Sequence, residues 1–307
     1  MHVTARLTRA AYDQARAFVN TRGRRLDAAL LDHAFDHAAA DSALVLLAGY
    51  QNPDGGFAHG LEPDLPTPTS TAIVTSVGLQ LLRQLGAPAE HAMVRAAIGW
   101  LAGAFDADLG VWPIINASVG LTPHAFWWDW DGDLAMRWNG FRFNPSAELL
   151  GDLYAYRSVA PATVIDRAQV ALLEAIGAVN RLDGAYDIKA LMRLIETEQT
   201  PDLVRGPAEA LMATTRDGFD PDDAHASPLD LTPRPRPGQA APVSDAVEGA
   251  LQALIAAQET DGGWRPFWDW SAVDAAAWTT AERAWRGVLT GQALETLSAY
   301  GRIDGPG

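Results

Sequence analysis

The chain has 307 residues, of which 48% are hydrophobic, so it can bury a substantial core and is expected to be globular. Its formal net charge of −15 argues against a nucleic-acid groove or an anionic membrane surface, because such partners require a basic footprint. The absence of cysteine excludes disulfides, thiolate zinc sites and cysteine nucleophiles.

The N-terminal segment, residues 1–18, mixes Arg, Asp and Gln with apolar residues and contains no continuous hydrophobic region of the kind found in signal peptides. No window of the chain approaches the apolar run that is needed to span a bilayer. We therefore expect a cytoplasmic protein without a membrane span. The sequence does not indicate whether it works with a partner domain or as an oligomer.

Apolar residues recur at helical spacing along most of the chain, and no comparable alternating pattern of strands is present. One such series is Ile73, Val77, Leu81, Leu82 and Leu85, and another is Val164, Ile165, Ala168, Leu172, Leu173 and Ile176. This pattern predicts an all-α protein. Residues 220–243 are rich in Pro and charge and are predicted to form a long surface loop.

A glycine turn occurs twice, as QNPDGGF at residues 51–57 and QETDGGW at residues 258–264, with weaker copies at 108–112, 182–186 and 216–219. Glycine can end a helix in the left-handed conformation, Asp can bind the local backbone, and the aromatic ring can cover the helix end. This repetition predicts about five to six helical hairpins. Because neither end has a capping repeat, a closed ring is favoured over an open solenoid.

The two stronger turns resemble the QW-type repeats of squalene–hopene and oxidosqualene cyclases and of protein prenyltransferase β subunits. The resemblance implies an α/α toroid, with helices around a central cavity, formed by residues 1–307 as a single domain. The glutamine and aromatic residue of each turn, Gln51, Phe57, Gln258 and Trp264, are expected to be structural. The zinc-dependent prenyltransferase branch is disfavoured because this chain lacks the cysteine ligand.

His59, Glu62 and Asp64 follow the first turn in a segment where prolines restrict the backbone, which suits side chains placed at a cavity mouth. His59 could move protons near neutral pH. In the alternative interpretation, Glu62 and Asp64 only stabilise the N-terminus of the helix that begins near Thr71, where negative charge is favoured.

The stretch WWDWDGD at residues 127–133 combines acidic and aromatic residues: Trp127, Trp128, Asp129, Trp130, Asp131 and Asp133. Carboxyl groups this close cannot all ionise easily, so one of them can act as a general acid, and indole faces can stabilise a cation. In the terpene cyclases the acid is the central Asp of a DxDD motif, which would be Asp131, although Gly132 stands at the fourth position. In the alternative interpretation the stretch is an ordinary loop.

A metal site of the EF-hand type is not expected at these aspartates, because Leu134 and Gly140 replace the glycine and glutamate that such a loop requires. The sequence predicts no metal site and no cofactor, apart from an Mg²⁺ ion if the substrate is a diphosphate. Trp268, Asp269 and Trp270 hold the corresponding place after the second turn and are predicted to bind substrate. If the ring closes, the two aromatic clusters meet at one mouth.

These features favour an enzyme, a terpenoid cyclase-like protein in which an Asp transfers a proton and tryptophans shelter the carbocation of a hydrophobic isoprenoid. One alternative is a carbohydrate-active α/α-barrel hydrolase, lyase or epimerase with paired carboxylates. The other is a non-catalytic helical-ring binding protein. An apolar pocket with one buried carboxyl would favour isoprenoids, whereas an open groove with paired carboxylates would favour sugars.

Overall fold

The computed structural model describes residues 5–130, 140–217, 227–232, 234–235 and 245–305. The regular structure of these residues is helical, and their extended segments pair only at isolated bridges. The prediction of an all-α protein is therefore confirmed. Among the helices of the described residues, none combines the length and the apolar character that a membrane crossing requires.

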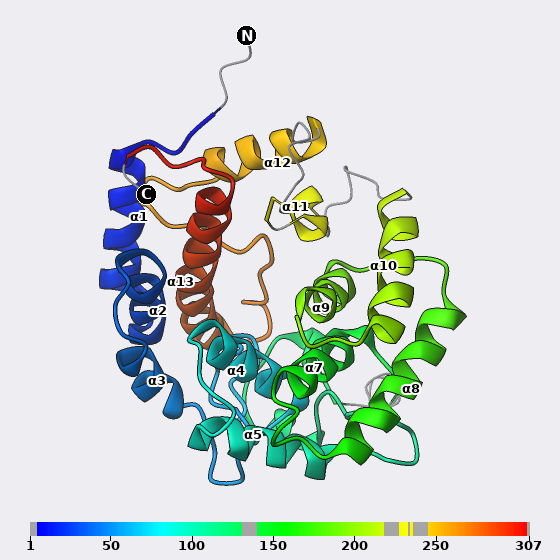
Figure 1. Ribbon diagram of the computed structural model, residues 1–307. Helices are drawn as coiled ribbons and strands as arrows, with labels where there is room; N and C mark the ends of the chain where they lie inside the picture. Colours follow the sequence, from blue (N-terminus) through cyan, green and yellow to red (C-terminus); the bar gives the residue numbers. More distant parts are fainter. Residues whose placement is uncertain (1–4, 131–139, 218–226, 233, 236–244, 306–307) are drawn as a thin grey trace. The chain divides into compact units, whose positions relative to one another are not determined.

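The chain folds into two compact units (Figure 1). Unit 1 comprises residues 1–46 and 226–307, and unit 2 comprises residues 47–225. Each unit contains one of the two strong glycine turns. The single-domain closed ring stays a prediction.

Unit 2 is built from helices that pack in pairs: α4 (Ala72–Gln84), α5 (Ala92–Ala104), α7 (Phe143–Ala155), α8 (Ala162–Ala178), α9 (Ala185–Glu196) and α10 (Asp202–Asp217). Helix α5 buries a single stripe of residues, whereas α7 is buried along most of its length and on all sides. A helix that is buried all round belongs to the middle of a core. Helix α7 accordingly packs against α4, α8 and α9.

Unit 1 is built from both ends of the chain: α1 (Arg9–Arg22), α2 (Arg25–Asp36), α3 (Asp41–Ala48, where the chain passes into unit 2), α11 (Pro228–Leu231), α12 (Asp245–Ala256) and α13 (Ala275–Ala299). Helix α13 packs against α1 and α2. The Leu7 amide donates to the Arg302 carbonyl at 2.7 Å, and the Asp304 amide donates to the Leu7 carbonyl at 2.8 Å. The first and last segments of the described chain therefore lie side by side.

The turn at 51–57 is held by side-chain and main-chain hydrogen bonds within unit 2. The side-chain amide of Gln51 donates to the carbonyls of Gly55 and Met93, both at 2.9 Å, and Met93 lies at the start of α5. The Phe57 amide donates to the Thr75 hydroxyl of α4 at 3.0 Å, and the Phe57 ring is fully buried. The turn thus connects two helices.

The turn at 258–264 repeats these hydrogen bonds within unit 1. Gln258 donates to the carbonyls of Gly262 and Ala11, again both at 2.9 Å, and Ala11 lies at the start of α1. The amide of the buried Trp264 donates to the Thr290 hydroxyl of α13 at 3.1 Å. The N-terminal helix α1 therefore takes, at the second turn, the place that α5 takes at the first.

One glycine in each turn has a backbone conformation that other residues rarely adopt. The φ angles of Gly55 and Gly262 are 99° and 95°. A Cβ atom on Gly55 would lie 2.3 Å from the carbonyl oxygen of Ala96, and one on Gly262 would lie 2.5 Å from that of Gln14. Both positions therefore require glycine.

The weaker copies of the turn differ from one another. The copy at 108–112 ends in the buried Trp112, as the strong turns end in buried rings. In the copy at 182–186, Tyr186 is instead 58% exposed. In the copy at 216–219, Gly218 and the aromatic Phe219 lie outside the described residues.

The region expected to be a long loop, residues 220–243, contains the short helix α11. Ser227 caps it by accepting the Leu229 amide at 3.2 Å, and the Asp230 carboxylate accepts the Ser227 amide at 2.8 Å. Proline is tolerated in the first turn of a helix, so the Pro-rich composition excludes long helices but not this one.

Candidate functional site

Two loops of unit 2 carry most of the predicted site residues. One precedes α4 and contains Asp64, and the other lies between α5 and α7 and contains Asp129. The Ala125 amide of the second loop donates to the Asp64 carbonyl at 3.1 Å. The structure therefore brings together two segments that the sequence presents as separate candidate sites.

His124 lies in the second of these loops, directly before Ala125, and was not predicted as a site residue. Its Nδ1 is 2.6 Å from the Thr122 carbonyl oxygen, and its Nε2 is 3.2 Å from Asp129 Oδ1. Because both neighbours are acceptors, the imidazole satisfies both when each ring nitrogen carries a proton. The ring is buried, whereas the Asp129 side chain is 46% exposed. The pair is therefore accessible from solvent through Asp129.

The aromatic residues of this segment divide into buried and exposed rings. Trp128 is buried, whereas Trp127 and Trp130 are half-buried. The centroid of the Trp127 ring lies 4.9 Å from that of Phe126, which is 56% exposed. We call Asp64, His124 and Asp129, with these rings, the loop cluster.

The three candidates at 59–64 do not form one group. His59 is exposed, has a φ angle of 61°, and places Nε2 2.8 Å from Asn52 Oδ1 in the first glycine turn. Asp64 is 2% exposed and Glu62 is half-buried. The N-cap of α4 is Thr71, and the first turn of that helix contains no acidic residue. Asp64 therefore belongs to the loop cluster and His59 to the turn.

Two of the predicted acids, Asp131 and Asp133, lie outside the described residues. Their role as catalytic groups therefore stays a prediction. Asp129 is the aspartate of this stretch for which the structure provides a contact.

The candidates that follow the second turn lie in unit 1. Trp270 is buried and packs edge-on against Trp278, with ring centroids 5.5 Å apart, and Trp268 is half-buried. Asp269 accepts the Ser271 amide at 2.6 Å, and this bond, together with the Ser271 hydroxyl, lowers the pKa of its carboxyl. These are contacts of packing and turn formation, and substrate binding by the three residues stays a prediction.

A further group of charged residues, not found from the sequence, lies between α4, α7 and α9. Glu148 and Asp152, one turn apart on α7, are 2% and 1% exposed. Arg83 of α4 donates to Asp152 at 3.0 Å, and Arg193 of α9 pairs with Glu148. We call these four residues the buried ionic cluster. In the sequence the two carboxylates look like an exposed helical pair, and their arginine partners lie far along the chain.

Burial raises the pKa of Asp152 to about 7, against the opposing effect of Arg83. Asp152 Oδ2 is buried and has no hydrogen-bond partner among the described residues. The group can therefore take up a proton near neutral pH, although its side chain is shielded from solvent. Across the part of the chain that the structure describes, no three acidic or histidine side chains are grouped so that they could hold a metal ion.

No family model and no curated protein matches this chain. A solved structure, the crystal structure of a protein from Actinoplanes, is similar at a TM-score of 0.58 and 19% sequence identity, covering 94% of this chain and 98% of that chain. At this identity the likeness concerns the fold alone.

Proposed function

We propose that the chain is an enzyme that starts carbocation chemistry on an isoprenoid by transferring a proton from an aspartic acid of unit 2. The observation that carries the proposal is the 3.2 Å contact between the accessible Asp129 and the buried imidazole of His124. The protonated imidazole can pass a proton to the Asp129 carboxylate, and the resulting carboxyl can donate it to an alkene or epoxide.

The tryptophans supply the second requirement of such a reaction, a surface that stabilises positive charge. Trp127, Trp128 and Trp130 flank Asp129 in the sequence, and indole faces attract cations through their quadrupole. Asp131 follows directly and is the second candidate acid, as its resemblance to the central residue of the cyclase motif suggests. The step requires no redox cofactor, and Mg²⁺ enters only if the substrate is a diphosphate.

A carbohydrate-active enzyme is the second candidate function. It is favoured by the exposure of Phe126, at 56%, beside a carboxylate that is itself 46% exposed. An open ring face next to an accessible acid suits a sugar that stacks on the ring while its glycosidic oxygen is protonated.

Ligand-dependent thermal stability distinguishes the two functions. Stabilisation by squalene, or by farnesyl or geranylgeranyl diphosphate with Mg²⁺ present, supports the isoprenoid enzyme. Stabilisation by neutral oligosaccharides alone supports the carbohydrate enzyme. If neither class raises the melting temperature, both proposals are wrong.

Variants of the acids then test the mechanism on the substrate so identified. Asp129→Asn or Asp131→Asn should lower turnover by roughly 10²-fold or more. Either variant should keep the ligand-induced shift, because the amide preserves shape but cannot donate the proton. His59→Ala and Glu62→Gln are the controls and should keep activity. Full activity in both Asp variants, with loss in the controls, would move the site to residues 59–64.

A further inference from the structure

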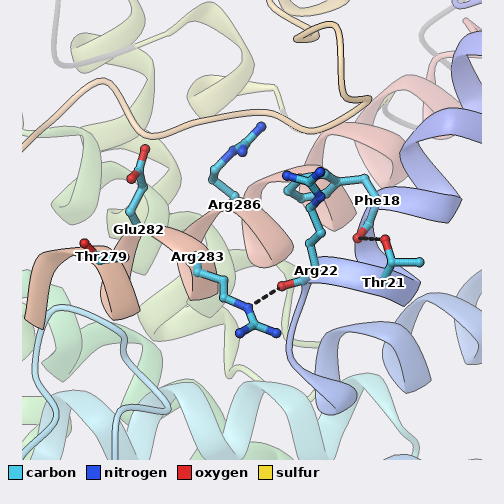
Figure 2. Close-up of a pocket in the computed structure, with 7 residues that line it drawn as sticks. All are labelled: Phe18, Thr21, Arg22, Thr279, Glu282, Arg283 and Arg286. Carbon is cyan, nitrogen blue, oxygen red and sulfur yellow. Dashed lines mark hydrogen bonds between the residues drawn. The ribbon is translucent and has the colours of Figure 1, made fainter. Parts of the chain in front are cut away.

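Each of the two glycine turns has a pocket beside it. In unit 2 a pocket of about 170 Å³ is lined by neutral residues that include Ser70, Thr71, Trp100, Ala104 and Asn116. In unit 1 a pocket of about 340 Å³ is lined by residues that include Phe18, Arg22, Glu282, Arg283 and Arg286 (Figure 2). We call them the neutral pocket and the arginine pocket.

The two pockets are equivalent on the helix that the glutamine of each turn binds. The glutamines bind the carbonyls of Met93 on α5 and Ala11 on α1. Trp100 follows Met93 at the same spacing as Phe18 follows Ala11, and Ala104 on α5 likewise corresponds to Arg22 on α1. The second glycine of each turn confirms the register. A Cβ atom there would lie 2.8 Å from the Trp100 ring in unit 2 and 2.8 Å from the Phe18 ring in unit 1.

They are also equivalent on the helix that follows each turn. The hydroxyls of Thr75 on α4 and Thr290 on α13 accept the amide of the aromatic residue of each turn. Thr71 precedes Thr75 at the same spacing as Arg286 precedes Thr290, so these two positions correspond. In unit 2 the turn aspartate, Asp54, accepts the Ser70 hydroxyl at 2.7 Å, whereas in unit 1 Asp261 accepts Arg286 Nη2 at 2.7 Å. The first turn forms with Ala104 and Thr71 at these two positions. The hydrogen bonds of the turn therefore do not by themselves require Arg22 and Arg286 at the second.

The charges around the arginine pocket do not cancel. Four guanidinium groups, those of Arg22, Arg265, Arg283 and Arg286, accompany the three carboxylates of Glu259, Asp261 and Glu282. This local excess of positive charge lies on a chain whose net charge is −15. Such a chain repels anions in general, so an anion would bind where arginines are concentrated.

The arginines have different positions in the pocket. Figure 2 shows the guanidinium groups of Arg22 and Arg286 on the same side of α13, while Arg283 points the other way and its Nε donates to the Arg22 carbonyl at 2.7 Å. Arg22 is 64% exposed, and its distance to Asp261 is 3.7 Å. The bonds of Arg286 to Glu259 and Asp261 both use Nη2, and its guanidinium group lies over the Phe18 ring, 4.5 Å from the ring centroid.

We propose that the arginine pocket binds a small molecule through one phosphate or carboxylate group, held by Arg22 and Arg286. Guanidinium groups suit both anions because their planar fork can donate two parallel hydrogen bonds. Arg283 positions the end of α1. Glu282 disfavours a second anionic group in the same molecule and can accept a hydrogen bond from a ligand hydroxyl.

Calorimetric titration of the full chain with inorganic phosphate and with acetate, at constant ionic strength, tests the proposal. We expect binding of at least one ion to the wild type, and a Kd about tenfold higher in Arg22→Ala and Arg22→Gln, because a hydrogen bond to a charged group is lost. The matched control is Arg9→Ala, which removes the same charge from α1 outside the pocket and should leave the Kd unchanged.

The ion that binds more tightly identifies the anionic group of the ligand. The proposal is overturned if neither ion binds the wild type, or if Arg9→Ala weakens binding as much as Arg22→Ala, since the effect would then be one of overall charge. It is equally overturned if both Arg22 variants fold, as judged by circular dichroism, and bind with the wild-type Kd.

Discussion

The turn at 51–57 in unit 2 and the turn at 258–264 in unit 1 have the same hydrogen bonds but different surroundings. Around the first, Asn52 and Ser70 supply neutral partners, whereas around the second Glu259 and Arg286 form ion pairs. The comparison shows that glycine conformation, a glutamine amide and main-chain groups define the turn. The other side chains are therefore free to carry charge or function.

The two units also place their charges differently. Unit 1 holds ion pairs around its turn, at partly exposed positions, whereas unit 2 holds Glu148 and Asp152 in a buried ionic cluster away from its turn. Burial disfavours the charged form of a carboxyl, and an adjacent arginine favours it. The pKa of Asp152 in unit 2 is raised and that of Asp261 in unit 1 is lowered, so their contributions to stability should depend on pH in opposite directions.

The largest expected effect concerns the glycines at which the two turns are most alike. Gly55→Ala and Gly262→Ala should each lower the free energy of unfolding by roughly 4 kcal/mol or more, because the new Cβ meets a carbonyl oxygen and the φ angle is strained. Urea unfolding followed by circular dichroism measures this. Gly86→Ala is the control, since Gly86 has a φ angle of 67° but no atom within 4 Å of the new Cβ.

At Gly86 we expect the cost of the left-handed conformation alone, about 1 to 2 kcal/mol. An equal loss at all three glycines would show that the backbone of the turns can move to admit a methyl group. A large loss at only one of the two turns would show that the turns are not equivalent.

The next largest effect is a pH dependence of stability that arises from the buried ionic cluster of unit 2. The pKa of Asp152 is about 7 in the folded protein, against an ordinary value of 3.8, so the folded state binds the proton more tightly. The resulting stabilisation of the folded state is fully present below pH 4. It is lost as the pH rises through 7, which lowers the free energy of unfolding by about 4 kcal/mol in all. Urea unfolding of the wild type and of Asp152→Asn at pH 5 and pH 8 measures it, and the variant should show a smaller decrease. The same decrease in both proteins would contradict this origin.

A smaller and equal effect is expected at the two glutamines. Gln51→Ala and Gln258→Ala should each lower the free energy of unfolding by roughly 1 to 3 kcal/mol, because each loses two hydrogen bonds to partly buried carbonyls. Gln252→Ala on α12 is the control, since this exposed side chain bonds to Glu248 on its own helix. Losses that differ by more than about 1 kcal/mol between the turns would argue against a shared structural role.

The smallest effect is expected at Asp261 in unit 1. Burial raises the pKa of this carboxyl, but hydrogen bonds from Arg286 and from the Gly263 amide outweigh it, so the net pKa is lowered. Its contribution is present above pH 4 and is lost as the pH falls below that, by less than about 1 kcal/mol because the group is partly exposed. Unfolding of Asp261→Asn between pH 5 and pH 3 should show a weaker acid dependence than the wild type. A stronger dependence would contradict the sign.

Much of the fold could be predicted from the sequence, since α4 and α8 lie where the apolar spacing of Ile73 and Val164 indicates. The site could be predicted only in part. Asp64 and Asp129 were both candidates, but the contact of their loops and the contact of His124 with Asp129 were not predicted. A histidine between Pro and Ala has no distinctive sequence signal, because its role comes from the carboxylate and carbonyl that the fold places beside it.

The amino-acid sequence by itself determined the helices and the two glycine turns, because helical periodicity and turn formation depend on residues within a few positions of one another. The tertiary structure alone decided which charges are buried and which are accessible. Arg83 and Asp152 are 69 residues apart, and Arg286 meets Asp261 only when α13 folds back on the turn. Proton affinity and charge excess depend on burial and on such distant partners, so they are properties of the packed helices.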